Sequence, residues 1–147
     1  MKKILMTGAV GVVGTFLRDE FRGRYNLRLS DMVAIEDCGP DEEFVEADLS
    51  NLEAVQNAVA GVDGIIHLGG YSVEGDWEPI LNANIIGAYN LFEAARLGGV
   101  KRVIFASSNH AVGFYERGET IDHTARLRPD TRYGLTKAFG ESLASLY

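Results

Sequence analysis

The sequence has almost no cysteine, no excess of basic residues and no long apolar run. One cysteine among 147 residues, Cys38, cannot form a disulfide within the chain, so we expect a reducing, cytoplasmic location. The 14 basic residues against 21 acidic ones give a net charge of −7, which argues against nucleic acid or an anionic membrane surface as a partner. The apolar runs are only strand-length, so we expect neither a membrane span nor a secretory signal.

The remaining composition is that of one globular domain. Hydrophobic residues make up 46% of the chain and charged residues 24%, and the length suffices for a core, so we treat residues 1–147 as a single domain. Strand-like runs alternate with runs of helical periodicity, which predicts an α/β Rossmann fold with a doubly wound parallel sheet in three layers, α/β/α. The strands are expected at 3–6, 27–29, 44–47, 62–68 and 101–106, and the helices at 13–21, 50–61, 78–97 and 132–147.

Helix-end signals refine this prediction. Ser50 followed by Glu53 has the spacing of a capping box, and Gly98-Gly99 ends the long third helix. Residues 107–131 are expected to form a long loop. The last helix runs to Tyr147 without a cap, and an enzyme of this fold needs more sheet and a substrate lid. We therefore expect the natural protein to continue into a C-terminal substrate region.

A glycine-rich segment joins the first strand to the first helix. Gly8, Gly11 and Gly14 permit a tight turn, close approach of a pyrophosphate and close packing of helix on strand. Val12 and Val13 lie at the helix N-terminus, whose free N–H groups attract phosphate. The segment therefore predicts a dinucleotide site, the alternative being a glycine-rich turn with no ligand.

Acidic residues after the next two strands predict how the adenosine end is held. Asp31 is placed to bind both hydroxyls of a ribose and to repel a 2′-phosphate, which favours NAD over NADP as the cofactor. Asp48 and Leu49 are placed to hold the adenine edge, although Asp48 is equally compatible with a solvated turn. Leu68, Gly69 and Gly70, after the fourth strand, complete the expected cofactor contacts. No metal site is expected.

A hydroxyl, a phenol and an amine are placed to act on one substrate oxygen. Tyr133 and Lys137 are four residues apart and share a helix face, whereas Ser107 and Ser108 end the fifth strand at the carboxyl edge of the sheet. A phenol with a pKa of about 10 accepts protons poorly at neutral pH, and a nearby ammonium favours the phenolate. The set predicts an alcohol dehydrogenase, with serine orienting the substrate oxygen.

Asn84 lies on the apolar face of the long helix, where a buried amide needs partners. It is compatible with two roles: organising the Lys137 end of a proton path beside the cofactor, or satisfying purely structural hydrogen bonds.

Together these motifs resemble the extended short-chain dehydrogenase/reductases, the NAD-dependent epimerase/dehydratase family. The resemblance rests on the glycine-rich loop, Asp31, the segment Asn84-Ile85-Ile86-Gly87, Ser108 and Tyr133-x-x-x-Lys137. Three further segments are similar to uronate dehydrogenases within that family. They are His67-Leu68-Gly69-Gly70-Tyr71-Ser72-Val73-Glu74, Phe105-Ala106-Ser107-Ser108-Asn109-His110 and Tyr133-Gly134-Leu135-Thr136-Lys137-Ala138-Phe139-Gly140-Glu141.

The resemblance implies oxidation of a hexuronic acid, glucuronate or galacturonate, at C1 to the aldarolactone with reduction of NAD. It also implies that Tyr133 is the general base, Lys137 its activator and Ser108 the hydroxyl partner. Ser72, Asn109 and His110 would hold the sugar acid, although His110 taken alone is compatible with a loop histidine satisfied by backbone. A homo-oligomer is expected. Two alternatives stay open: a sugar-nucleotide epimerase or dehydratase of the same fold, and a non-catalytic dinucleotide-binding module.

Overall fold

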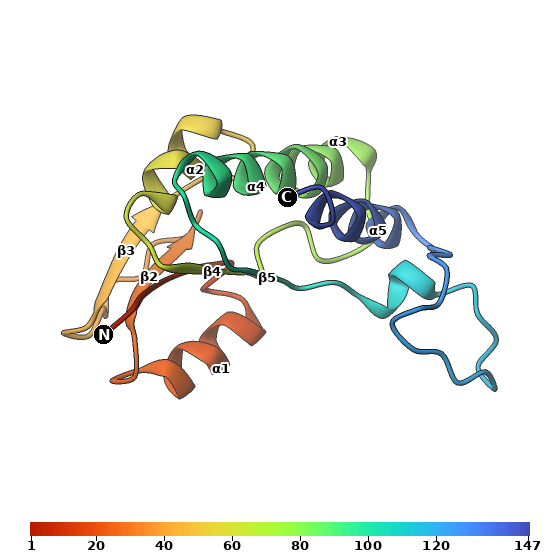
Figure 1. The fold of residues 1–147 in the computed structure, drawn as a ribbon, viewed down its shortest axis with the longest axis horizontal. Coiled ribbons are helices and arrows are strands. Elements are labelled where there is room, and N and C mark those ends of the chain that lie inside the picture. Colours follow the sequence, from red (N-terminus) through yellow and green to blue (C-terminus); the bar gives the residue numbers. More distant parts are fainter.

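Five parallel strands form one sheet, with the first strand in its centre. The computed structural model describes residues 1–147. The sheet order is β3-β2-β1-β4-β5, and every neighbouring pair is parallel (Figure 1). From β1 the chain first adds β2 and β3 on one side and then β4 and β5 on the other. This change of direction opens a crevice at the carboxyl ends of β1 and β4. The strands are β1 (Lys3–Thr7), β2 (Asn26–Asp31), β3 (Glu42–Glu46), β4 (Gly64–His67) and β5 (Val103–Phe105).

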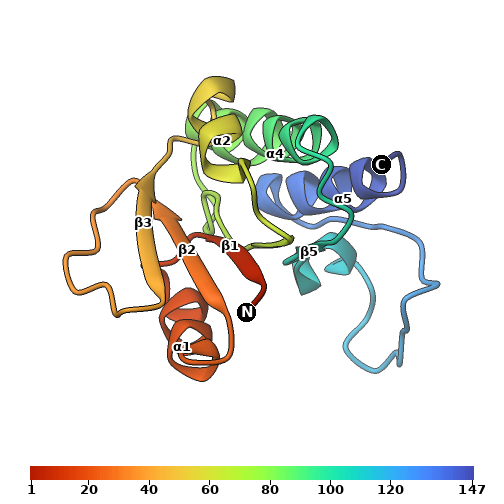
Figure 2. The ribbon, with the colours of Figure 1, turned by 60° about the vertical axis from the view of Figure 1, so that its left-hand side comes forward.

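Helices cover both faces of the sheet, which confirms the predicted three-layer Rossmann fold. One face carries α1 alone, and the opposite face carries the other helices, as both ribbon views show (Figures 1 and 2). Segment 107–131 extends to one side of the sheet (Figure 2) and contains a short 3-10 turn, η2 (Asn109–Val112). The helices are α1 (Val12–Phe21), α2 (Leu52–Val59), α3 (Trp77–Ile80), α4 (Gly87–Leu97) and α5 (Arg132–Ala144).

Alternation along β1 builds a separate core on each face of the sheet. Leu5 packs toward α2 and α4, with Val55, Val59 and Leu91. The next residue, Met6, faces α1 in a smaller cluster that includes Leu27 and Leu29. Because successive side chains of a strand point to opposite faces, one central strand anchors both layers and fixes the crevice between them.

The predicted 50–61 helix begins differently from expectation, and the capping box of Ser50 and Glu53 is wrong. Asn51 is the N-cap, and its side chain accepts a hydrogen bond from the Ala54 amide at 3.2 Å. The Ser50 hydroxyl instead donates to Asp48 at 2.8 Å. Ser50 therefore stabilises the turn after β3, and the next residue, Asn51, caps the helix.

Two other helices also differ from the prediction. The long helix expected at 78–97 is a continuous run of α3, a π-helical segment η1 (Leu81–Ile86) and α4. The helix α5 ends at Ala144, where the Ser145 amide donates to the Glu141 carbonyl, so the expectation that the chain stops inside a helix is wrong. No helix in the structure combines the length and the apolar character needed to cross a membrane.

Candidate active site

A cleft of about 700 Å³ lies over the carboxyl ends of the strands. Most of the residues expected to bind cofactor or substrate line it: Gly8, Gly11, Val12, Val13, Gly14, Asp31, Asp48, Leu49, Leu68, Gly69, Gly70, Ser72, Tyr133 and Lys137. Four expected residues do not line it: Asn84, Ser108, Asn109 and His110. Ser107, expected beside Ser108 at the end of the fifth strand, also lines the cleft. Residues without a predicted role complete the lining: Thr7, Val10, Ser30, Met32, Ala47, Tyr71, Ala83 and Ala106.

The glycine-rich loop forms one end of the cleft, and two of its glycines are required by close contacts. Gly8 has φ +70°, and a Cβ there would lie 2.7 Å from the Gly69 amide nitrogen. A Cβ at Gly14 would overlap the Gly8 carbonyl oxygen. No side chain caps the N-terminus of α1. Its first amides, including those of Val12 and Val13, are therefore available to an anion in the cleft.

Asp31 lies against this loop, at the end of the cleft where the adenosine is expected. Its carboxylate accepts hydrogen bonds from the amides of Val10 at 3.0 Å and Met32 at 2.8 Å. Asp48 lines the same part of the cleft, while one of its oxygens accepts from the Ser50 amide at 2.8 Å. Asp48 therefore serves a turn and also borders the space where an adenine would lie.

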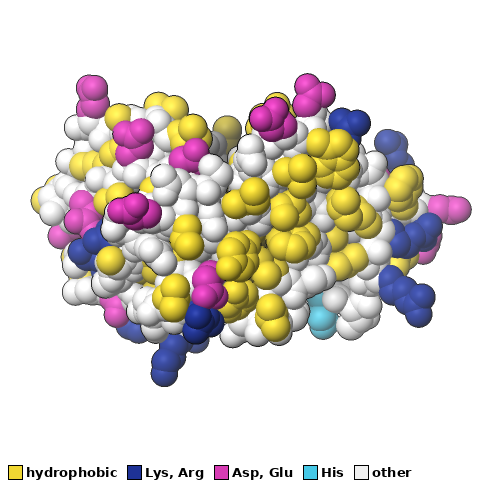
Figure 3. Space-filling model, turned by 90° about the horizontal axis from the view of Figure 1, so that it is seen from above, with side chains coloured by type: hydrophobic (Ala, Val, Ile, Leu, Met, Phe, Trp, Pro, Cys, Tyr) yellow, Lys and Arg dark blue, Asp and Glu magenta, His cyan; other side chains and the backbone are white.

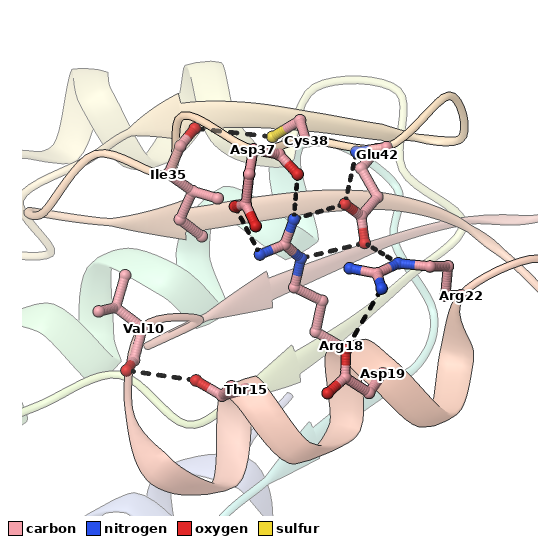
Figure 4. Close-up of polar contacts among 10 residues, drawn as sticks. Val10, Thr15, Arg18, Asp19, Arg22, Ile35, Asp37, Cys38 and Glu42 are labelled. Atoms are coloured by element: carbon pink, nitrogen blue, oxygen red, sulfur yellow. Dashed lines mark hydrogen bonds and ion pairs between the residues drawn. The ribbon is translucent and has the colours of Figure 1, made fainter.

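An ion-pair network centred on the buried side chains of Arg18 and Glu42 holds the loop that follows Asp31 (Figure 4). The Arg18 guanidinium of α1 binds both oxygens of Glu42, at 3.1 and 2.7 Å, and reaches the carboxylate of Asp37 at 3.1 Å. Its NH2 group also donates to the Asp37 carbonyl at 2.8 Å. The hydrogen bond to Arg18 lowers the pKa of Glu42 to about 2. The network ties α1, which follows the glycine-rich loop, to the segment that carries Asp31 and Met32.

Lys137 is buried beside Tyr133. Its ammonium donates to the Ala106 carbonyl at 2.8 Å and lies 5.5 Å from the centre of the Tyr133 ring and 4.9 Å from that of Phe105. Only 7% of Lys137 is exposed, and burial lowers its pKa to about 8. A cation in this position favours negative charge on the neighbouring phenol.

The two serines after β5 point in different directions. Ser107 lines the cleft and donates to Glu141 of α5. Ser108 caps the η2 turn, where its hydroxyl accepts from the His110 amide at 3.2 Å and donates to Asn109 at 3.3 Å. The structure therefore places Ser107, and not Ser108, on the wall of the cleft.

Asn84, in the π-helical segment, is fully used by protein partners. Its Oδ1 accepts from the Tyr71 amide at 2.6 Å, and its Nδ2 donates to the Tyr71 carbonyl at 2.9 Å and to the Thr136 hydroxyl at 3.0 Å. It therefore links the loop after β4 to the residue next to Lys137. The structure shows no direct hydrogen bond between Asn84 and Lys137.

His67 and Glu74 also contact residues of the site, although neither was predicted to have a role there. Nδ1 of the buried His67 lies 2.7 Å from the Thr7 hydroxyl, and burial, aided by the Lys137 charge, lowers the His67 pKa to about 3. Glu74 accepts a hydrogen bond from the backbone amide of Tyr133 at 3.1 Å. Two signals could have pointed to them: both lie at or after the end of a central strand, and they bound the segment 67–74 that is similar to uronate dehydrogenases.

The match to a family model covers residues 4–147, and its description is NAD dependent epimerase/dehydratase family. The chain belongs to this family. It is 50% identical over 147 residues to the uronate dehydrogenase of Pseudomonas syringae pv. tomato, covering 99% of this chain and 54% of that protein. The predicted resemblance to uronate dehydrogenases is thereby confirmed. The chain spans about half the length of the curated relatives it matches.

Solved structures of the family have the same fold. A mutant uronate dehydrogenase from Agrobacterium tumefaciens complexed with NAD matches with a TM-score of 0.96 and 48% identity, over 100% of this chain and 56% of that one. A UDP-glucose 4-epimerase from Thermus thermophilus complexed with NAD matches with a TM-score of 0.89 and 27% identity, over 99% of this chain and 50% of that one.

The residues of this epimerase/dehydratase family member fit a dinucleotide. The uncapped helix N-terminus suits a pyrophosphate, and Gly8 and Gly11 leave the backbone accessible to it. Asp31 offers a carboxylate at the ribose position, and Lys137 and Tyr133 border the opposite end of the cleft. The family and the cleft therefore agree on the kind of ligand.

Proposed function

We propose that the whole protein is an NAD-dependent uronate dehydrogenase that oxidises a hexuronic acid at C1 to the aldarolactone. The observation that carries this proposal is the shared cleft, in which Tyr133 and the buried ammonium of Lys137 border the same space as the glycine-rich loop and Asp31. Three curated uronate dehydrogenases at 49–50% identity support the choice of substrate class.

In the proposed mechanism Tyr133 removes the proton of the C1 hydroxyl. Lys137, held by the Ala106 carbonyl, stabilises the phenolate by its charge. Asp31 binds the ribose, and Ser72, Asn109 and His110 hold the sugar acid. When bound, NAD supplies the hydride acceptor.

The serine that orients the substrate oxygen is assigned by resemblance to Ser108. Because Ser107 is the serine on the wall of the cleft, Ser107→Ala and Ser108→Ala should be compared side by side. We expect Ser108→Ala to lower kcat by less than loss of the base does, since it removes an orienting hydrogen bond only. A larger loss with Ser107→Ala would move the role to Ser107.

A steady-state assay of the whole protein tests the substrate class. NADH formation is followed with glucuronate, galacturonate and UDP-sugars, and turnover of either hexuronate with NAD is the expected result. The structural match to a UDP-glucose 4-epimerase supports the second candidate, a sugar-nucleotide epimerase or dehydratase. Conversion of a UDP-sugar without net NADH would favour that candidate, and binding of NAD without any turnover would favour a non-catalytic module.

We infer further that the protein forms a homo-oligomer through η1 and α4. Hydrophobic side chains gather over the half of this face where Figure 1 places α3, α4 and α5 (Figure 3). Leu81, Ile86 and Tyr89 are more than two-fifths exposed, at 41%, 43% and 47%. A second copy would remove these side chains from water. Light scattering should show a dimer or larger assembly that Tyr89→Glu dissociates, and a monomeric wild type would contradict the inference.

We also infer a cytoplasmic location. Cys38 is a free, half-buried thiol, which suits a reducing compartment. Fractionation of cells that produce the whole protein should place its NAD-dependent activity in the cytoplasmic fraction, and recovery outside that fraction would contradict the inference.

A further inference from the structure

A histidine–aspartate pair lies beside the proposed base. Nδ1 of His110 is 2.8 Å from Oδ1 of Asp130. The same two residues are joined a second time through the backbone, because the Asp130 amide donates to the His110 carbonyl at 3.3 Å. Asp130 directly precedes Thr131, the N-cap of the helix that carries Tyr133. The pair thus connects the η2 turn to the start of the catalytic helix.

Two glycines leave the room that this pair needs. A Cβ at Gly113 would overlap the carboxylate of Asp130, and a Cβ at Gly134 would overlap the carbonyl oxygen of His110. A larger residue at Gly134 would clash with the His110 backbone and push the turn away from α5, whereas one at Gly113 would displace the Asp130 carboxylate from His110. The local backbone is therefore shaped around the contact between His110 and Asp130.

The imidazole of His110 faces Tyr133 and keeps one nitrogen free. The two rings meet edge to face, with centroids 6.0 Å apart and an interplanar angle of 73°. Nδ1 is used by Asp130, and Nε2 has no hydrogen-bond partner in the protein. The His110 side chain is 42% exposed.

We propose that Asp130 is a positioning residue that fixes the tautomer of the His110 imidazole with the proton on Nδ1, so that Nε2 accepts a hydrogen bond from a hydroxyl of the sugar acid beside Tyr133. This inference rests on the proposed function. An ionised carboxylate can only accept hydrogen bonds, so the nitrogen that faces it carries the proton. The hydrogen bond from His110 lowers the pKa of Asp130, which keeps the carboxylate ionised at neutral pH. The free nitrogen is then an acceptor for a hydroxyl donor.

A purely structural ion pair is the competing explanation, and its consequences differ. The side chain of Asp130 is 27% exposed and that of His110 is 42% exposed, and exposed pairs contribute little to stability. Loss of the carboxylate should therefore leave unfolding nearly unchanged. It should instead change the tautomer of His110 and the KM for the sugar acid, which a structural pair would not affect.

Nitrogen-15 NMR of the whole protein tests the tautomer without reference to activity. The chain has 3 histidines, so their ring signals can be assigned with single His→Gln variants. In the wild type at alkaline pH we expect His110 to carry its proton on Nδ1, and in Asp130→Ala we expect proton density to move to Nε2. The matched control is Asp122→Ala, since Asp122 is exposed and its carboxylate binds only Thr124. A wild-type proton on Nε2, or no change in Asp130→Ala, overturns the proposal.

Kinetics with the hexuronate then test the consequence. We expect Asp130→Ala to raise the KM for the sugar acid about tenfold, the cost of one lost hydrogen bond, with the KM for NAD unchanged. Asp130→Asn keeps the size of the side chain and should fold normally, with a smaller rise in KM. An unchanged KM for the sugar acid in both variants contradicts the proposal. If no hexuronate is turned over at all, the proposed function fails while the NMR result still decides the tautomer.

Discussion

Tyr133 differs from phenylalanine by one oxygen, so Tyr133→Phe isolates the proposed base. We expect kcat with a hexuronate to fall by about 10²–10⁴-fold, the usual contribution of general-base catalysis. Affinity for NAD, measured by titration, should change little, because the ring and its packing against His110 stay in place. Wild-type turnover in this variant would show that Tyr133 is not the general base and would favour a nucleotide-binding role for the protein.

Asp31 should decide the choice between the two nicotinamide cofactors. Its carboxylate is already held by the Val10 and Met32 amides, so a 2′-phosphate entering the cleft would meet a fixed negative charge. We expect kcat/KM to be higher with NAD than with NADP, and Asp31→Ser to narrow that difference. Equal wild-type values for the two cofactors would disprove the role of Asp31.

The burial of Lys137 should lower the free energy of unfolding, a cost that its proposed catalytic role explains. The unfolded chain binds the lysine proton more tightly than the folded one, because burial lowers the pKa from 10.5 to about 8. This cost is complete below pH 8 and disappears as the pH rises toward 10.5. After allowing for the lost bond to Ala106, we expect Lys137→Met to raise the unfolding free energy by about 2 kcal/mol at pH 7 and by less at pH 10.

Urea denaturation at both pH values measures this effect, with the exposed Lys101→Met as the control. A Lys137→Met protein that is less stable than the wild type at pH 7 would show that the ammonium stabilises the fold, contrary to this account.

At the scale of elements, one ion-pair network joins α1, β3 and the loop between β2 and β3. Glu42 is 1% exposed in its side chain and binds Arg18 through both oxygens. We expect Glu42→Gln to lower the unfolding free energy by about 3 kcal/mol at pH 7, because it leaves a buried guanidinium with less compensation. Glu46→Gln is the matched control, since Glu46 lies on the same strand, is exposed and forms no ion pair, so its substitution should cost under about 1 kcal/mol.

The pH dependence of this network has a defined sign. The pKa of Glu42 is lowered from 4.5 to about 2, chiefly by Arg18, so its stabilisation is complete above pH 4.5 and is lost as the pH falls toward 2. The difference between wild type and Glu42→Gln, followed by thermal denaturation, should therefore shrink across that range. If the difference in stability between the two proteins stays constant from pH 7 to pH 2, it does not arise from the charge of Glu42.

At the scale of the molecule, cofactor binding should stabilise the whole domain. Residues at or just after the carboxyl end of every strand line the cleft, so a bound ligand contacts all five strands' ends. NAD at one hundred times its Kd should stabilise the fold by about 2.7 kcal/mol. Gly14→Ala should abolish that gain, because the new Cβ would overlap the Gly8 carbonyl and force α1 away. Gly118→Ala, with open space around it, is the control, and a full NAD response in Gly14→Ala would contradict the packing argument.

The sequence by itself determined the features that depend on near neighbours along the chain. Periodicity predicted the alternation of strands and helices, and the spacing of Gly8, Gly11 and Gly14 predicted the turn into α1. Local signals were less reliable where polar residues compete, as Ser50 and Asn51 did for one helix start. The sequence pattern alone does not show which of two adjacent polar residues will make the capping hydrogen bond.

Only the tertiary structure decided which distant residues meet. Glu74 binds the Tyr133 amide across 59 positions, and Arg18 reaches Glu42 across 24. The strand pattern placed Ser107 and Ser108 together, and the family resemblance assigned the hydroxyl role to Ser108. The direction of the chain after β5 instead turns Ser107 toward the cleft and Ser108 toward the η2 turn. A hydrogen bond depends on distance and direction in space, and those are set only when the sheet brings the ends of its strands together.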